Sequence, residues 1–295
     1  MHDPIPVVTP ADQKSRVRSF FDDSKPWQGD MYGDASDYTS RLIRRRKDYA
    51  IAMLSDAADL RPGKALDIGC GSGVYLEELL ARGFDTTGLD LSAEMLDSCR
   101  KRFEGRAEYE DRLSLVRGDV ETLPFQDGEF DLIVCMGVLG YLVTDERAVA
   151  EIRRVLRPGG YILLSVTNLY SLADADAELR RRMRSAVRPS RSGTAGPASP
   201  PYAQHSEWMV RHRGYYNKSY DLPKFEDFLA KNGLNRVDAM TYGFEFRLLR
   251  RTRLVPARWL DRLELSLERL GREGRLPLVP RAGWGYTGLF RKGGA

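Results

Sequence analysis

The chain of 295 residues contains few cysteines and no long apolar run. No stretch approaches about 18 consecutive apolar residues, which excludes a membrane-spanning helix. The first residues lack a basic segment followed by an apolar one, so we expect no secretory signal. The three cysteines, Cys70, Cys99 and Cys135, are odd in number and lack metal-ligand spacing. We therefore predict a reduced, cytoplasmic protein without disulfides or structural zinc.

Charge is distributed unevenly along the chain. The formal net charge is +4, but residues 1–167 carry 22 Lys and Arg against 29 Asp and Glu, whereas residues 168–295 carry 24 against 13. The basic second part suits an anionic substrate, a membrane surface or nucleic acid. Arginine outnumbers lysine by 37 to 9. Genomic base composition alone can produce such a bias, so the charge does not choose among these partners.

Short apolar strands alternate with helical patterns in the first part of the chain. Helices of about 10–15 residues between strands imply right-handed crossovers, and hence an α/β fold with a doubly wound parallel sheet. The predicted strands are 65–68, 84–89, 114–116, 130–135 and 161–166, and the predicted helices are 74–82, 92–103 and 145–156.

The remaining residues divide into three further predicted parts around a core at 60–167. Strand patterns at 236–242 and 284–290 extend the sheet, and an amphipathic pattern at 256–270 predicts a helix between them. The predicted parts are an N-terminal helical segment or flap (1–59), a lid insertion with a flexible loop at 189–201 (168–220), and the end of the core sheet with an insertion at 243–283 (221–295).

The clearest motif is Leu66-Asp-Ile-Gly-Cys-Gly-Ser-Gly73, which follows a predicted strand and opens a predicted helix. Glycine permits positive φ and a close approach of the backbone to a ligand. The helix N-terminus adds unpaired N–H donors. A dinucleotide fold has Gly-x-Gly-x-x-Gly here, whereas this third glycine comes one residue early. The segment alone predicts a nucleotide-like cofactor without identifying it.

Acidic residues follow the next two strands. Asp90 ends the strand at 84–89, where a carboxylate can accept hydrogen bonds from both hydroxyls of a ribose. Asp119 ends the strand at 114–116, where it can accept from an adenine amino group. The fourth strand then runs into Met136 and Gly137, at the crevice where ligands bind such sheets.

In their order over residues 60–170, these motifs resemble those of class I S-adenosylmethionine-dependent methyltransferases, and most closely the ubiquinone and menaquinone biosynthesis subtype. The resemblance implies a Rossmann-like sheet of seven strands with the last one antiparallel, helical lid insertions, and S-adenosylmethionine as cofactor. It also implies that the glycine loop holds the methionine moiety, Asp90 the ribose and Asp119 the adenine edge. The full implied cofactor set is Asp67, Gly69, Cys70, Gly71, Gly73, Asp90, Leu91, Met95, Asp119, Val120, Met136 and Gly137.

The activity implied by the resemblance is methyl transfer to a small-molecule acceptor, with oxygen as our preferred acceptor atom. Such an in-line displacement needs alignment and exclusion of water, and in some cases a base. His205 is one candidate base, although we favour a solvent-facing histidine over a catalytic one. Tyr141 is a second candidate, at a position where the family often has histidine. We expect no DNA partner and no metal.

Two other classes of function stay open. One is RNA or protein methylation through the basic second part, which we favour less because no RNA-binding module is recognisable. The other is a cofactor-binding protein without turnover, or one that binds a membrane surface through residues 256–270. Anionic lipid would repel Asp261, Glu264 and Glu268, so we favour a helix with its leucines packed inward. The sequence does not determine the oligomeric state.

Several residues also have a simpler structural interpretation. Cys70 is expected to be a small filler, since no Cys/His pair is visible. The basic run at 44–47 is expected to be a solvated helix face. Four aromatic residues lie near the N-terminus: Phe20, Phe21, Trp27 and Tyr32. They either form a flap over the cofactor or pack against the edge of the sheet.

Overall fold

The computed structural model describes residues 9–24, 38–171, 200–205, 215–244, 255–272 and 282–294. Trp27, Tyr32 and most of the predicted loop at 189–201 lie outside the described residues. Within the described part, no helix is long and apolar enough to cross a membrane.

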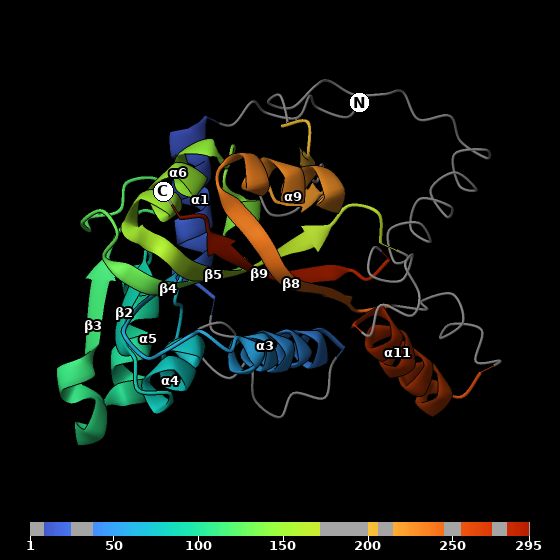
Figure 1. The fold of residues 1–295 in the computed structure, drawn as a ribbon, viewed down its shortest axis with the longest axis horizontal. Helices are drawn as coiled ribbons and strands as arrows, with labels where there is room; N and C mark the ends of the chain where they lie inside the picture. Colours follow the sequence, from blue (N-terminus) through green and yellow to red (C-terminus); the bar gives the residue numbers. More distant parts are fainter. Residues whose placement is uncertain are drawn as a thin grey trace.

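The described residues form one mixed sheet of nine strands (Figure 1). Its central strands are parallel and run in the order β3-β2-β1-β4-β5. β9 is antiparallel to β5, and β8 is antiparallel to β9. The strands are β1 (Lys64–Ile68), β2 (Asp85–Asp90), β3 (Leu113–Arg117), β4 (Phe130–Met136), β5 (Leu156–Asn168), β6 (Ala203–His205), β7 (Lys218–Tyr220), β8 (Leu234–Tyr242) and β9 (Gly285–Lys292).

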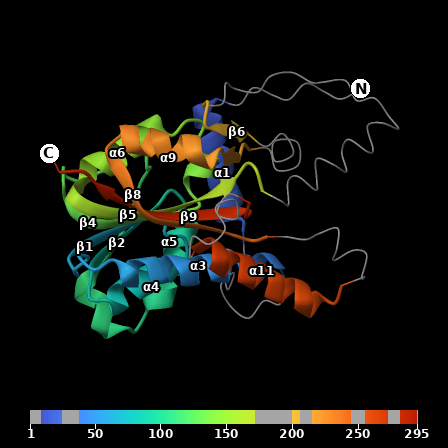
Figure 2. The ribbon, with the colours of Figure 1, turned by 45° about the vertical axis from the view of Figure 1, so that its right-hand side comes forward.

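Helices cover both faces of this sheet, with α6 and α9 on one side and α3 and α4 on the other (Figure 2). Two short 3-10 helices, η1 and η2, complete the secondary structure of the described residues. The helices are α1 (Pro10–Asp22), α3 (Tyr38–Asp56), α4 (Val74–Ala81), α5 (Ala93–Phe103), η1 (Ala107–Arg112), η2 (Leu139–Tyr141), α6 (Glu146–Val155), α9 (Leu222–Lys231) and α11 (Ala257–Arg272).

The central strand β4 explains why the core is continuous across the sheet. Alternate side chains of a strand point to opposite faces, and a strand covered on both faces is apolar at almost every position. Ile133 and Cys135 accordingly join the cluster beneath α6 and α9, whereas Leu132 and Val134 join the cluster beneath α3 and α4. All four are fully buried.

The predicted doubly wound α/β fold is confirmed, including the antiparallel pair formed by its last two long strands. The sheet has two strands more than the seven expected. β6 and β7 are only three residues long, which is too short for an alternating pattern to reveal. β7 pairs with Thr167 and Asn168 of β5 beyond the last residue with which β4 pairs, and so extends the sheet past the end of β4.

The packing of α11 differs from the prediction of inward-facing leucines. Leu260 is buried, but Trp259 is 57% exposed and Leu263 is 44% exposed. Glu264 and Glu268 are the buried side chains instead, at 0% and 2% exposure. Arg45 of α3 forms ion pairs with both carboxylates, which allows them to face the protein.

Candidate functional site

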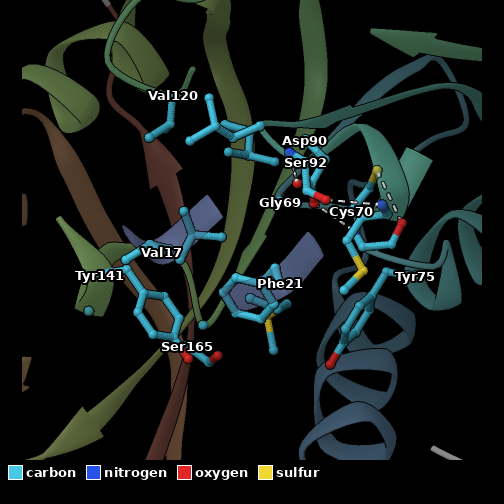
Figure 3. Close-up of a pocket in the computed structure, with 18 of the residues that line it drawn as sticks. Val17, Phe21, Gly69, Cys70, Tyr75, Asp90, Ser92, Val120, Tyr141 and Ser165 are labelled. Carbon is cyan, nitrogen blue, oxygen red and sulfur yellow. Dashed lines mark hydrogen bonds between the residues drawn. The ribbon is translucent and has the colours of Figure 1, made fainter. Parts of the chain in front are cut away.

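A cavity of about 470 Å³ opens at the carboxyl ends of the central strands, as expected for ligand sites in open α/β sheets (Figure 3). The loop between β1 and α4 forms one wall, and α1 and α3 supply the opposite walls. Of the predicted cofactor residues, all but two line this cavity. The lining members of that set are Gly69, Cys70, Gly71, Asp90, Leu91, Met95, Asp119, Val120, Met136 and Gly137.

The glycine loop takes a conformation that other residues would resist. Gly69 has a φ of +69°, and a Cβ built there would lie 2.4 Å from Val138 Cγ2. Gly71 has a φ of +52°, and a Cβ built there would meet nothing within 4 Å, so its surface is open for a ligand. Gly73 does not line the cavity but caps the start of α4, which directs the first N–H groups of this helix toward the loop.

Asp90 connects the glycine loop to the end of β2. Its Oδ2 accepts a hydrogen bond from Gly71 N at 2.9 Å, and its Oδ1 accepts one from Ser92 N at 2.9 Å. Burial raises the pKa of Asp90, while these backbone donors act in the opposite direction. Each oxygen keeps a second lone pair for a ligand hydroxyl.

Asp67 lies in β1, behind the loop, and does not line the cavity. Its side chain is 1% exposed, and its Oδ2 makes no hydrogen bond within the described part of the chain. Burial, together with the nearby charge of Asp90, holds the pKa of Asp67 well above its usual value. Buried polar atoms normally have partners, so the unsatisfied Oδ2 marks Asp67 as a polar group held directly beneath the glycine loop.

Helix α1 closes the cavity from the side of β3. Lys14 Nζ lies 2.5 Å from Asp119 Oδ2 and also forms an ion pair with Glu121. Gln13 donates from Nε2 to the carbonyl oxygens of Tyr141, at 2.8 Å, and Tyr216, at 2.7 Å. α1 therefore joins the end of β3 to η2 across the mouth of the cavity.

Aromatic rings surround the end of the cavity at η2. The Tyr141 ring packs edge-on against Phe21 of α1 at 5.4 Å and at a tilt against Tyr215 at 5.8 Å. Burial raises the pKa of Tyr141, whereas the charge of Arg46 lowers it in part. Tyr141 therefore stays protonated at neutral pH and can donate a hydrogen bond to a ligand.

Arg46 reaches this region from α3 and lines the cavity. Its Nη1 lies 3.0 Å from the position that a Cβ of Gly137 would occupy. Neighbouring Arg45 forms ion pairs with the buried carboxylates of α11, and Lys47 forms one with Glu78. The prediction of a solvated face at 44–47 is therefore wrong for Arg45 and Arg46.

A buried ion pair between β7 and the start of α6 lies next to η2. Lys218 of β7 lies 2.6 Å from Asp145 at the start of α6, and both side chains are fully buried. Tyr220 also donates to Asp145 Oδ1 at 3.1 Å. Burial lowers the pKa of Lys218 and raises that of Asp145, each opposed by the partner's charge. Because breaking a buried pair is strongly destabilising, this contact fixes β7 against α6.

The remaining candidate residues are Cys70, His205 and Phe21. Cys70 lines the cavity, but a hydrogen bond with Cys99 and burial hold the pKa of its thiol well above the usual value, which suits a filler. His205, the last residue of β6, pairs through its backbone with Lys218 of β7, and its side chain lies outside the described residues. Its role as a base stays a prediction. Phe21 does line the cavity, as the flap hypothesis expected.

Sequence reasoning missed Gln13, Lys14 and Arg46 at this site. One signal was available for Arg46, because it shares a helical stripe with Leu42, Ala50 and Met53 and so lies on the buried face of α3. Gln13 and Lys14 carried no comparable signal, since nothing in an N-terminal polar segment shows where a helix will dock.

Comparison with known proteins finds relatives of the central part of the chain. Residues 66–164 match the family model of a methyltransferase domain. The malonyl-[acyl-carrier protein] O-methyltransferase of Erwinia pyrifoliae is 36% identical over 129 residues, which are 43% of this chain and 47% of that protein. The ubiquinone biosynthesis O-methyltransferase of Methylococcus capsulatus is 32% identical over 127 residues, which are 41% of this chain and 52% of that protein. The chain thus spans about half the length of these relatives.

Solved structures share the fold over nearly the whole chain. A 1,6-didemethyltoxoflavin-N1-methyltransferase of Burkholderia thailandensis, solved with 1,6-didemethyltoxoflavin and S-adenosylhomocysteine, has a TM-score of 0.57 and 19% identity, covering 98% of this chain and 94% of that one. The [4+2]-cyclase SpnF has a TM-score of 0.59 and 17% identity, and the match covers 100% of both chains. At these levels of sequence identity, the similarity shows a shared fold alone.

The sheet topology and the matched domain define a class I methyltransferase core. Residues 66–164 therefore form a methyltransferase domain, and quinone-biosynthesis enzymes are among the proteins to which the chain is similar, as its motifs predicted.

Proposed function

We propose that this chain binds S-adenosylmethionine and transfers its methyl group to an oxygen of a small-molecule acceptor. The observation that carries the proposal is the continuous cavity that begins between Asp90 and the glycine loop, passes Gly137 and ends at Tyr141. One end has the polar partners that a nucleoside requires, and the other end is aromatic. A cofactor and an acceptor could therefore lie end to end in it.

The residues present fit this cofactor. Asp90 offers lone pairs for two ribose hydroxyls, Gly71 leaves open space above the loop, and the unsatisfied Oδ2 of Asp67 lies beneath it. Asp119 lies at the next strand end, where its Oδ2 contacts Lys14 and its Oδ1 accepts from Glu121 N at 2.9 Å. Its carboxylate is thereby oriented for an adenine edge. The remaining predicted cofactor residues, Leu91, Met95, Val120 and Met136, supply apolar walls.

When bound, the cofactor supplies an activated methyl group on a sulfonium. The protein's task is then to align an acceptor and exclude water. Phe21 and Tyr141 pack together over the η2 end of the cavity, so they can hold an acceptor while limiting the access of solvent. The Tyr141 hydroxyl, protonated at neutral pH, would orient an acceptor oxygen by donating to it, which is a binding role and not that of a base.

Two observations support oxygen as the acceptor atom. Both curated relatives named above are O-methyltransferases by name. The walls at the η2 end combine aromatic rings with hydroxyl and amide groups, among them Ser165, Thr167 and Asn217. Such walls suit a flat apolar molecule that bears hydroxyls.

The first experiment is calorimetric titration of S-adenosylhomocysteine into the wild type and the Asp90→Ala variant. Loss of a carboxylate that accepts from hydroxyls costs about 1.5–3 kcal/mol, or roughly 10- to 100-fold in Kd. Asp85→Ala is the matched control, since Asp85 begins the same strand at its exposed opposite end. Equal affinities for all three proteins would refute the ribose site.

The acceptor is tested with a labelled methyl donor and paired phenols and anilines of one ring system. Label on the phenols supports transfer to oxygen, and label on the anilines alone contradicts it. Firm cofactor binding without label on any acceptor would favour a role without methyl transfer. Salt-sensitive RNA binding together with labelled RNA would revive the nucleic-acid alternative.

A further inference from the structure

Helix α11 carries more strongly exposed large apolar side chains than any other helix in the described part of the chain. Among the described residues, five large apolar side chains are strongly exposed, and three of them belong to α11: Trp259, Leu263 and Leu265. In Figures 1 and 2 this helix projects from the lower right of the molecule, beyond α3. Clustered exposure of this kind marks an interaction surface, unlike isolated exposed residues.

Among the described residues of α11, two of the three buried side chains, Glu264 and Glu268, are acidic, which accounts for this exposure. Glu268 accepts a hydrogen bond from Gly243 N at 3.0 Å and another from the Tyr49 hydroxyl. Arg45 Nη1 lies 3.2 Å from Glu264 and 3.3 Å from Glu268. The helix is therefore anchored to α3 and to the end of β8 by its carboxylates, and this anchoring turns its apolar stripe outward.

The apolar stripe runs along the helix at positions 259, 263, 267 and 270, which recur at helical spacing. Trp259 and Leu263 are exposed, and Leu267 and Leu270 are half-buried. An exposed basic row, Arg258, Arg262 and Arg269, runs beside this stripe.

Burial of the acidic residues changes the charge that α11 presents to its surroundings. Glu264 and Glu268 face Arg45 and not the solvent, and Asp261 is half-buried. Among the side chains of α11 that the structure describes, the exposed charged ones are accordingly all positive. The electrostatic objection to an anionic membrane, which held for the sequence, does not hold for the folded helix.

We infer that the outer face of α11, formed by Arg258, Trp259, Arg262, Leu263 and Arg269, docks on an anionic lipid surface. An apolar stripe beside a basic row is the pattern of a helix that lies in the membrane interface, where arginines reach lipid phosphates and tryptophan lies at headgroup depth. A second copy of this chain is a poorer occupant, since antiparallel pairing of two such faces would oppose their arginine rows.

The test is co-sedimentation of the full chain with vesicles of phosphatidylcholine alone and of phosphatidylcholine mixed with phosphatidylglycerol. We expect binding to the mixed vesicles, at least tenfold weaker binding to the neutral ones, and release at high salt. Trp259 should enter the interface, so tryptophan emission should shift to shorter wavelength on binding in the wild type and not in Trp259→Phe.

Two double variants separate the contribution of the basic row to vesicle binding from that of the apolar stripe. Arg258→Glu/Arg262→Glu and Trp259→Ser/Leu263→Ser should each weaken vesicle binding at least tenfold. Arg100→Glu/Lys101→Glu makes the same change of charge on the exposed side of α5 and should leave vesicle binding within threefold. Affinity for S-adenosylhomocysteine, measured on each variant, reports intact folding independently of the membrane result.

Three outcomes would overturn the inference. The first is absence of binding to either vesicle type by wild-type protein that binds S-adenosylhomocysteine. The second is an equal loss in the α5 variant, which would indicate general charge attraction. The third is a dimer, detected by light scattering, that Trp259→Ser/Leu263→Ser dissociates, because a second copy would then cover this face.

Discussion

Among single residues, Arg46 shows most clearly how position decides chemical role. Arg44 and Arg46 are two residues apart on α3, yet only Arg46 lines the cavity, beside Gly137. The cofactor's methionine moiety carries a carboxylate, and the resemblance places that moiety at the glycine loop, which lines the same cavity as Arg46. A guanidinium at this point is suited to bind it.

The corresponding prediction is that Arg46→Met weakens binding of S-adenosylhomocysteine by roughly 10- to 100-fold, about 1.5–3 kcal/mol. Methylthioadenosine lacks the carboxylate, so its affinity should change less than threefold. Titration calorimetry with both ligands measures the difference, and Arg44→Met serves as the control. If both ligands lose affinity equally, Arg46 acts on the shape of the cavity and not on a carboxylate.

At the scale of elements, α6 holds the loop after β3 through one charged cluster. Arg154 donates from Nε to Glu151 at 2.8 Å, from Nη2 to the carbonyl oxygen of Leu123 at 2.9 Å, and from Nη1 to that of Phe125 at 2.7 Å. Glu151 in turn accepts from Leu123 N at 2.8 Å. The hydrogen bond from Arg154, together with the weaker contribution of Leu123 N, holds the pKa of Glu151 below its usual value.

A lowered carboxyl pKa gives stability that is complete above the unfolded-state pKa of about 4.3 and is lost as the pH falls through the lower folded-state pKa. Glu151→Gln should therefore reduce the free energy of unfolding by about 1 kcal/mol at pH 7, a modest value because the pair is partly solvated. Denaturant titrations should show this difference shrinking below about pH 4. Exposed Glu110→Gln is the control, and a difference that does not depend on pH would exclude the charge as its cause.

For the molecule as a whole, α1 joins regions that are far apart in the sequence. Ser92 donates to Asp22 at 2.5 Å, Lys14 contacts Asp119, and Gln13 bonds the backbone of Tyr141 and Tyr216. The helix thus spans the glycine-loop side and the η2 side of the cavity. A ligand in the cavity would touch α1 along its inner face.

Amide hydrogen exchange measures whether a bound ligand holds α1 over the cavity. We expect S-adenosylhomocysteine to slow amide exchange in α1 at least fivefold, since a bound ligand adds contacts to a helix with few of its own. Exchange in α9, on a sheet face away from the cavity, should not change. Equal slowing in both helices would mean global stabilisation and not closure by α1.

Much of the fold could be predicted from the sequence, because its signals are local. The helix predicted at 92–103 begins where Ser92 caps α5 by accepting from Met95 N. The strand predicted at 130–135 is an apolar run, which is typical of a strand covered on both faces. β6 and β7 could not be predicted, since strands of three residues depend on the edge of β5 that they join.

The candidate site likewise contains residues that the sequence predicted and residues that it did not. Asp90 and Gly71 were both predicted as cofactor residues because each directly follows or ends a strand of the parallel sheet, and the structure joins them by a hydrogen bond. Lys14, by contrast, meets Asp119 across more than a hundred residues. No short-range pattern encodes such a contact.

The sequence by itself determined the longer parallel strands, the glycine loop and the acidic strand ends, since periodicity, turns and caps act over a few residues. Only the tertiary structure decided which cations line the cavity and which face of α11 is exposed. The physical reason is that a helix can bury carboxylates when a buried arginine faces them, as Arg45 faces Glu264 and Glu268. That neutralisation depends on a partner helix that is remote in the chain, and it turns Trp259 and Leu263 toward the solvent.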